Sequence, residues 1–194
     1  MIPIGPNEIK LISRYIYALS GIYLDQRKAY LIESRLGPIL EELCLASYAE
    51  LVKTAQADPG KTIERKIIDA ITTNETLFFR DTGPFELLQH KILPDLIDAR
   101  TAETSGQLPI PIRIWCAACS TGQEVYSAAI VLKELSLDLN RFNIKLLGTD
   151  ISDEAVRKAS KGEFSKFEIN RGVAPDKLRK YFHPPGEPGR LGMK

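Results

Sequence analysis

A switch from helical to strand patterning near residue 112 limits the fold of this chain more than any other feature. Residues 112–118, "IRIWCAA", form a short apolar run that is rich in β-formers, and residues 142–150, "FNIKLLGTD", form a second one. Residues 121–136, between them, have the spacing of an amphipathic helix. Because a strand, a helix and a strand joined by short loops form a right-handed parallel unit, we predict an α/β domain here.

The part of the chain before this switch has helical patterns and no strand pattern. In its first segment, apolar residues recur at the spacing of one helix face, at Ile9, Ile12, Ile16 and Leu19. Asn7 is predicted to cap this helix and Gly21 to end it, while Ser47 is predicted to cap a later helix. The last helical pattern ends near residue 72. We predict a small all-α domain.

Outside these regions, the sequence predicts one further long helix and little other regular structure. This helix covers residues 85–102, with a slight break at Pro94, and a flexible connection follows over residues 102–111. Residues 183–194 are rich in proline and glycine and predict no regular structure.

Composition excludes several classes of function. The net charge of +1 over 194 residues gives no overall attraction to nucleic acid. No apolar run is long enough to span a bilayer, so we predict no membrane insertion. The three cysteines are too few for a secreted disulfide framework, which favours the cytoplasm. We predict no metal site.

The pair Cys116 and Cys119, in the string "WCAAC", is open to two interpretations. A C-x-x-C string suggests a thiol–disulfide enzyme, in which the first cysteine begins a helix. Here Cys116 falls within a predicted strand, and no strand-associated proline follows before Pro175. We therefore favour two small apolar residues next to a loop and keep a redox enzyme as a distant alternative.

The loop after the first strand and the acids near it predict a binding site for a nucleoside ligand. Gly122 and its small neighbours allow a ligand to approach the start of the following helix. Asp150, at the end of the next strand, could hold a ribose diol. Glu124 would repel phosphate but suits an ammonium group, and S-adenosylmethionine combines ribose and ammonium without phosphate. Alternatively, Asp150 is a turn or cap residue and Glu124 a first-turn acid that the helix dipole favours.

Three strings resemble, in order and spacing, motifs of the chemoreceptor glutamate methyltransferases, the CheR family: "NETLFFRD" at 74–81, "IWCAACSTGQEVYSAAI" at 114–130 and "LLGTDIS" at 146–152. The resemblance covers essentially the whole chain. It implies an all-α N-terminal domain followed by an α/β Rossmann-like S-adenosylmethionine-dependent methyltransferase domain. The expected parts are a helical, receptor-docking domain at 1–72, a linker with the first motif at 73–84 and a partial methyltransferase domain at 85–194.

The resemblance also implies roles for single residues. The residues implied to line the S-adenosylmethionine pocket are Asn74, Thr76, Arg80, Glu124 and Asp150. Of these, Arg80 is also implied in the methyl-transfer site, Glu124 in contact with the methionine ammonium and Asp150 in contact with the ribose. Gln123 and Val125 differ from the glutamate and proline that the family usually has there, but neither carries an inferred contact with the ligand.

The implied reaction is the methylation of glutamate side chains on chemoreceptors, with S-adenosylhomocysteine as the second product. A glutamate side chain, with a reference pKa of about 4.3, is already an anion at pH 7 and can attack a sulfonium methyl directly. No general base is needed, and Arg80 could orient the carboxylate. The alternative is a non-catalytic module that binds the receptor or the cofactor.

The methylation helices of chemoreceptors are acidic, and the N-terminal domain offers cations to them. Arg27, Lys28 and Arg35 lie in one predicted helical segment, and Arg14 lies on the preceding one. We predict that these residues bind the receptor. The alternative is an ordinary solvated helix face.

Members of the family continue well past position 194, and a later Cys-Arg-Asn segment of theirs is absent here. We therefore expect a truncated chain whose sheet has an unpaired strand edge and an uncovered face. Such a chain is predicted either to self-associate, by exchanging or pairing strands, or to have lost its C-terminal part after folding. In either case it is predicted to have little methyltransferase activity by itself.

Overall fold

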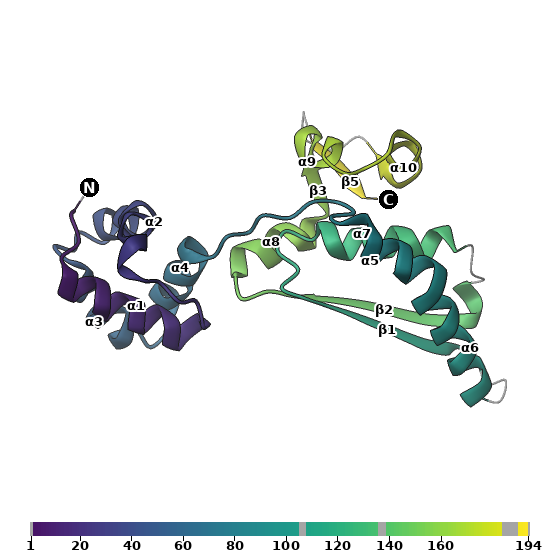
Figure 1. Ribbon diagram of the computed structural model, residues 1–194, viewed down its shortest axis with the longest axis horizontal. Helices are drawn as coiled ribbons and strands as arrows, with labels where there is room; N and C mark the ends of the chain where they lie inside the picture. The colour runs from purple at the N-terminus through teal and green to yellow at the C-terminus, as the bar shows by residue number, and fades with distance from the viewer. Residues whose placement is uncertain (1, 105–107, 136–138, 184–189, 194) are drawn as a thin grey trace. The chain divides into compact units, whose positions relative to one another are not determined.

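The computed structural model describes residues 2–104, 108–135, 139–183 and 190–193. The chain divides into two compact units, of which the first comprises Met1–Thr73 and Ile151–Asp153 and the second Asn74–Asp150 and Glu154–Lys194. Figure 1 labels most of the helices and strands of both units. In the described part of the chain, no helix is both long and apolar enough to cross a membrane.

The first unit is a bundle of helices around one apolar core. Its elements are α1 (Pro6–Ser20), the 3₁₀ turn η1 (Gln26–Lys28), α2 (Ala29–Glu42), α3 (Tyr48–Ala57) and α4 (Thr62–Ile71). Every α-helix of the bundle contributes fully buried side chains, among them Ile12, Leu36, Tyr48, Leu51 and Ile67. The prediction of an all-α N-terminal part is confirmed.

Helix ends in this unit follow the local sequence, with one exception. Gly21 ends α1 with a left-handed φ of 73°, and the Ser47 side chain accepts a backbone hydrogen bond at the start of α3. The predicted cap at Asn7 is wrong, because Gly5 occupies the cap position and Pro6 begins the helix. Proline suits the first helical position, since the N–H that it lacks would have no partner there.

The second unit contains the predicted α/β arrangement. Its elements around the parallel sheet are β1 (Ile110–Ala117), α7 (Gln123–Glu134), η3 (Leu139–Arg141), β2 (Phe142–Thr149) and α8 (Asp153–Lys161). The two strands pair in parallel, and α7 forms the connection between them. A parallel pair with a helical crossover confirms the predicted fold class.

The helical segment before β1 begins earlier than predicted and is not a regular α-helix. It consists of α5 (Thr82–Leu87), the π-helical turn η2 (Leu88–Ile92) and α6 (Leu93–Glu103). Pro94 has no N–H to donate to the carbonyl of His90, and the wider π-helical turn lies directly before it. The predicted connection over 102–111 is shorter, because β1 already begins at Ile110. Residues 105–107 of that connection lie outside the described part.

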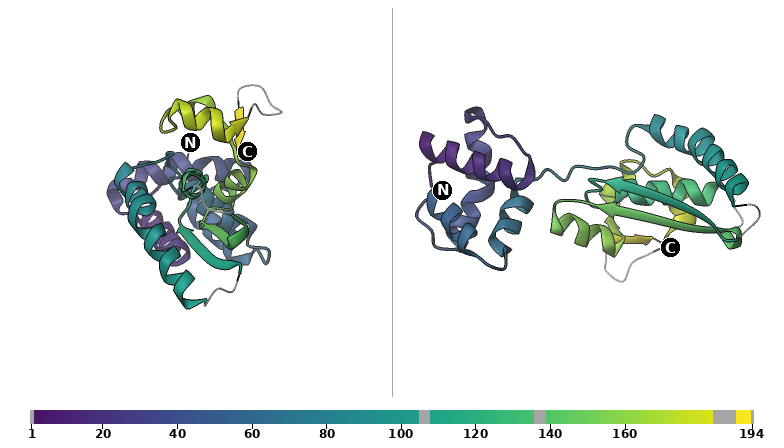
Figure 2. Two further views of the ribbon diagram at one scale, coloured as in Figure 1. Left: turned by 90° about the vertical axis from the view of Figure 1, so that its right-hand side faces the viewer. Right: turned by 90° about the horizontal axis from the view of Figure 1, so that it is seen from below.

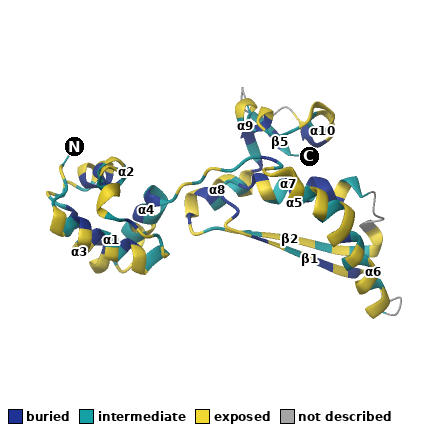
Figure 3. Cartoon of the chain, in the orientation of Figure 1, coloured by how far each residue is buried: buried dark blue, intermediate teal, exposed yellow. Residues whose placement is uncertain are grey.

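In the described residues, only one face of the parallel sheet is covered. On that face, side chains of both strands pack with Leu93 of α6 and Val131 of α7. On the other face, Trp115 and Leu147 are neighbours in the strand register and expose 68% and 58% of their surface. The right view of Figure 2 looks onto this face with both strands in front, and Figure 3 shows the exposed positions along them.

A small antiparallel sheet lies at the C-terminal end of the described residues. The elements of this region, which we call the small sheet region (residues 163–183 and 190–193), are β3 (Glu163–Ser165), α9 (Lys166–Asn170), α10 (Pro175–Tyr181), β4 (Phe182–His183) and β5 (Arg190–Met193). The strand order is β3-β5-β4. The prediction of no regular structure over 183–194 is wrong for His183 and for 190–193, because pairing with distant strands organises them. Residues 184–189 and 194 lie outside the described part.

Candidate functional site

The loop between β1 and α7, residues 118–122, has an uncommon backbone conformation. Ala118, Ser120 and Gly122 have left-handed φ angles of 58°, 49° and 98°. Gly122 also has to be small, because a Cβ there would lie 2.9 Å from the Cβ of Ala159 in α8. Such conformations cost free energy in residues other than glycine and are enriched at ligand-binding sites.

Asp150 lies directly beside this loop. Its Oδ2 accepts a hydrogen bond from the N–H of Ser120 at 2.7 Å. The N–H of Cys119 donates to the carbonyl of Thr149 at 2.9 Å, so two bonds join the loop to the end of β2. The acid therefore lies at the carboxyl ends of parallel strands, where folds of this class bind ligands. Its contact with a ribose stays a prediction.

The string at residues 74–81 runs along the same loop and along the start of α7. Ser120 Oγ donates to the carbonyl of Asn74 at 3.0 Å. The N–H of Phe79 donates to Ser127 Oγ at 2.9 Å. Ser120 thus bonds to the motif through its side chain and to the acid at the end of β2 through its N–H.

Two further residues that are predicted to line the pocket belong to the same motif. Thr76 is half-buried. Arg80 donates from Nη1 to the carbonyl of Glu75 at 3.3 Å and lies 3.9 Å from the carboxylate of Asp81. Because 59% of its side chain is exposed, the guanidinium of Arg80 is accessible to an incoming carboxylate.

Cys116 and Cys119 are free and buried. Burial, followed by the charge of Glu124, an exposed residue in the first turn of α7, raises the pKa of Cys116 to about 11. Burial also raises the pKa of Cys119, with Asp150 as the next cause. Since the thiolate is the reactive form of cysteine, both residues are unreactive thiols at neutral pH. This chemistry opposes the redox alternative.

The cations predicted to bind a receptor lie in two different environments. Arg14, Arg27 and Lys28 are exposed. Arg35 is half-buried. Its Nη1 donates hydrogen bonds to the carbonyls of the last two residues of α4, Ala70 at 3.3 Å and Ile71 at 2.8 Å, and to that of Thr72, the next residue, at 2.8 Å. Arg35 therefore satisfies the C-terminal end of α4. This role could not be predicted from the sequence, because α4 is distant from Arg35 in the chain.

Comparison with known proteins assigns the chain to a family. The model of the CheR methyltransferase SAM-binding domain matches residues 74–190, and that of the CheR methyltransferase all-alpha domain matches residues 7–72. This chain belongs to the CheR methyltransferase family. S-adenosylmethionine is accordingly the cofactor of the domain matched over 74–190.

Curated relatives of this CheR chain are chemotaxis methyltransferases by name. It is 38% identical to chemotaxis protein methyltransferase Cher2 of Pseudomonas putida, over 90% of this chain and 62% of the relative. It is 37% identical to chemotaxis protein methyltransferase 1 of Pseudomonas aeruginosa, over 96% and 66%. It is 34% identical to the chemotaxis protein methyltransferase of Vibrio parahaemolyticus, over 100% and 67%. The chain spans about two thirds of the length of these relatives.

The groups around loop 118–122 of this CheR chain fit the chemistry of that cofactor. A carboxylate such as Asp150 can accept two hydrogen bonds from a diol, and Glu124 carries the charge that an ammonium group needs. Among the described residues, no cluster of three or more His, Cys, Asp and Glu could hold a metal ion. The roles of Ser120 and Ser127 could not be predicted from the sequence, because residue type and spacing do not indicate their distant partners.

Proposed function

We propose that the protein to which this CheR chain belongs transfers methyl groups from S-adenosylmethionine to glutamate side chains of chemoreceptors in the cytoplasm. One observation carries the proposal. Ser120, in the 118–122 loop, forms hydrogen bonds both to Asp150 and to the 74–81 motif. The names of the relatives, chemotaxis protein methyltransferases, support the choice of substrate. The products are a glutamate methyl ester and S-adenosylhomocysteine.

Each candidate residue has a role in this proposal that its chemistry permits. Asp150 binds the ribose and Glu124 the ammonium group, while Asn74 and Thr76 complete the pocket. The cofactor, when bound, supplies a methyl group on a positively charged sulfur. Arg80 orients the receptor carboxylate through its guanidinium. Because that carboxylate is an anion at pH 7, positioning is sufficient and no general base takes part.

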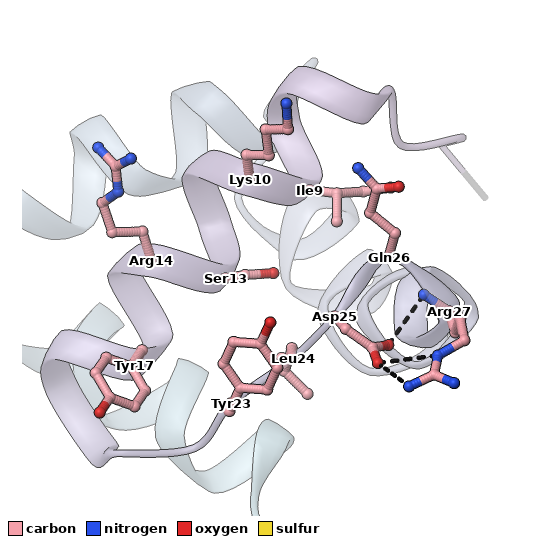
Figure 4. Close-up of a pocket in the computed structure, with 10 residues that line it drawn as sticks. All are labelled: Ile9, Lys10, Ser13, Arg14, Tyr17, Tyr23, Leu24, Asp25, Gln26 and Arg27. Carbon is pink, nitrogen blue, oxygen red and sulfur yellow. Dashed lines mark hydrogen bonds and ion pairs between the residues drawn. The ribbon is translucent and has the colours of Figure 1, made fainter.

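We propose that an acidic receptor helix binds to an open groove in the first unit. The groove has a volume of about 890 Å³ and is lined by α1 and by the segment that follows it. Figure 4 shows Lys10, Arg14 and Tyr17 along α1 and Tyr23 on the segment that faces this helix. The two tyrosines expose 57% and 71% of their surface. Arginine and tyrosine are the residue types that most often dominate binding energy at interfaces.

The predicted docking cations contribute unequally to this surface. Arg14 and Arg27 line the groove, and Lys28 is the next residue in η1. Arg27 pairs with Asp25 at 2.7 Å, which reduces the net positive charge that it offers. Arg35 holds the end of α4 instead, and we leave it out of the proposed docking surface. We therefore expect Arg14 to contribute most.

The test is the transfer of labelled methyl groups to a receptor fragment by the complete protein. Arg14→Glu is expected to lower kcat/KM by about 3- to 10-fold, because like charges then face each other. The affinity for S-adenosylhomocysteine should not change, and added salt should lower the wild-type rate in a similar way. Lys53→Glu, at an exposed position on α3, is the control and should behave as wild type.

The outcomes of this assay separate the alternatives. If Arg14→Glu and Lys53→Glu have equal rates, the groove does not bind the receptor. If the wild-type protein transfers no methyl group, the enzymatic proposal is wrong and the non-catalytic binding module replaces it.

We also propose that the isolated chain self-associates through the uncovered face of its parallel sheet. Trp115 and Leu147 are large, apolar and exposed there, whereas parallel sheets are normally covered on both faces. Light scattering should detect dimers or larger species, and Leu147→Lys should favour the monomer by placing a charge on this face. The methyl-transfer rate of the isolated chain should be low beside that of the complete protein. A monomeric wild-type chain at high concentration would contradict the proposal.

A further inference from the structure

The motif that carries Arg80 packs against the small sheet region. Phe78 is only 1% exposed, and its ring meets the rings of Phe164 and Phe182 edge-on, with centroids 4.8 and 5.6 Å away. Figure 1 shows the chain entering α5 after it passes close to α7 and the small sheet region. The position of the motif backbone therefore depends on a region that follows much later in the chain.

The loop between α9 and α10 approaches the motif even more closely. At Gly172, a Cβ would lie 2.0 Å from the carbonyl oxygen of Phe78, far inside van der Waals contact. The backbone of Gly172 is not in the left-handed region, so glycine is needed here for space and not for conformation. Only a residue without a side chain lets the two backbones come so close.

The preceding residue, Arg171, is linked to Arg80 through Glu75. The guanidinium of Arg171 lies 3.5 Å from the Glu75 carboxylate and packs over the ring of Phe167. The carbonyl of the same Glu75 accepts a hydrogen bond from Nη1 of Arg80 at 3.3 Å. A shift of the small sheet region would therefore move Glu75 and, with it, Arg80.

The backbone around Arg80 needs support from its surroundings. Its two neighbours, Phe79 and Asp81, have left-handed φ angles of 50° and 52°. This conformation is unfavourable for residues other than glycine, and it persists only where surrounding contacts hold it. Ser127 Oγ accepts the N–H of Phe79, and the Phe79 ring meets Phe85 with centroids 5.4 Å apart. The Phe78 contacts hold the same backbone from the side of the small sheet region.

Helix α7 in turn holds the small sheet region. Glu134, at the end of α7, accepts hydrogen bonds from Lys180 at 2.7 Å, from Tyr181 and from Lys177 at 3.1 Å. These bonds lower the pKa of Glu134 to about 2, so that the carboxylate stays charged at physiological pH. The motif, α7 and the small sheet region thus pack as one body.

We infer that the small sheet region is a positioning element for Arg80, with Gly172 and Arg171 as its positioning residues. The inference rests on the proposed role of Arg80 in methyl transfer. Neither positioning residue touches the reacting groups. Both act by holding the backbone conformation that aims the Arg80 guanidinium, so a change at either slows the transfer step in a protein that remains folded.

The direct test is Gly172→Ala in the complete protein, with Gly83→Ala as the matched control. A Cβ at Gly83 would meet no atom within 4 Å, so the control should match wild type. Gly172→Ala is expected to lower kcat roughly 10- to 100-fold, since a displacement of about 1 Å has an effect of this size. KM for the receptor should change little, because the groove of the first unit is intact. A folded Gly172→Ala protein with wild-type kcat would overturn the inference.

A second set of variants applies if Gly172→Ala does not fold. Arg171→Glu breaks a partly exposed ion pair and should leave the protein folded with a several-fold lower kcat. Arg171→Lys should keep most of the activity, and Arg171→Glu combined with Glu75→Arg should recover part of it. An unchanged kcat in Arg171→Glu would contradict the positioning role of the Arg171–Glu75 ion pair. A charge-swapped protein that recovers no activity would contradict it as well.

Hydrogen exchange of the amides at residues 74–81 tests the same inference without the reaction. Exchange should be faster in Gly172→Ala and Arg171→Glu than in wild type, because Phe79 and its neighbours are then held less firmly. Unchanged exchange in both variants would overturn the positioning role. A wild-type protein that transfers no methyl group would instead overturn the proposed function, so the two failures are distinguishable.

Discussion

Replacing Asp150 by alanine is expected to weaken the binding of S-adenosylhomocysteine to the complete protein by about 1.5–3 kcal/mol, the range for hydrogen bonds to a charged group. The variant loses the carboxylate that is proposed to hold the ribose. It also loses the 2.7 Å bond from the N–H of Ser120, which joins the loop to the end of β2. Titration calorimetry measures the change, which corresponds to a factor of roughly 10 to 150 in Kd.

Two companion variants define what this result means. Asp150→Asn keeps the size of the side chain and one acceptor oxygen, and it should weaken binding less than Asp150→Ala. Asp176→Ala removes an exposed carboxylate in the first turn of α10 and should bind as wild type. If Asp150→Ala leaves the affinity unchanged, Asp150 is only a turn or cap residue.

Phe78→Ala is expected to lower the free energy of unfolding of the second unit by about 3–5 kcal/mol, as for other fully buried phenylalanines. Phe78 is 1% exposed and lies between the rings of Phe164 and Phe182. Its removal leaves a cavity between the motif and the small sheet region, which neither side can fill without moving its backbone. Denaturant unfolding, followed by circular dichroism, measures the loss.

The control for this prediction is Phe167→Ala in α9. Phe167 exposes 69% of its surface and contacts Arg171 as a cation–π pair. Its removal should cost no more than about 1 kcal/mol, the value for exposed pairs of this kind. A Phe78→Ala protein as stable as Phe167→Ala would show that the two regions do not share a core.

Local patterns in the sequence were sufficient for most helices, for both parallel strands and for the family. Gly21 and Ser47 act on backbone groups within one helical turn, so their effects follow from the neighbouring residues alone. Asp150 could be placed beside the first loop because parallel strands bring their carboxyl ends to one edge of a sheet. Three strings with characteristic order and spacing pointed to the CheR family, and the comparison over 7–72 and 74–190 confirmed it.

Contacts between distant segments could not be inferred in this way. The residues of β5 follow a proline- and glycine-rich stretch, and they form a strand because β3 and β4 offer backbone partners on both sides. Arg35 has the positive charge expected of a docking residue, yet its guanidinium binds the end of α4. Gly172 has to be glycine only because the carbonyl of Phe78 lies against it. The sequence by itself determined the helices and strands and the residues with suitable chemistry. Only the tertiary structure decided which of these residues contact one another, because spacing along the chain does not indicate which distant residues come close on folding.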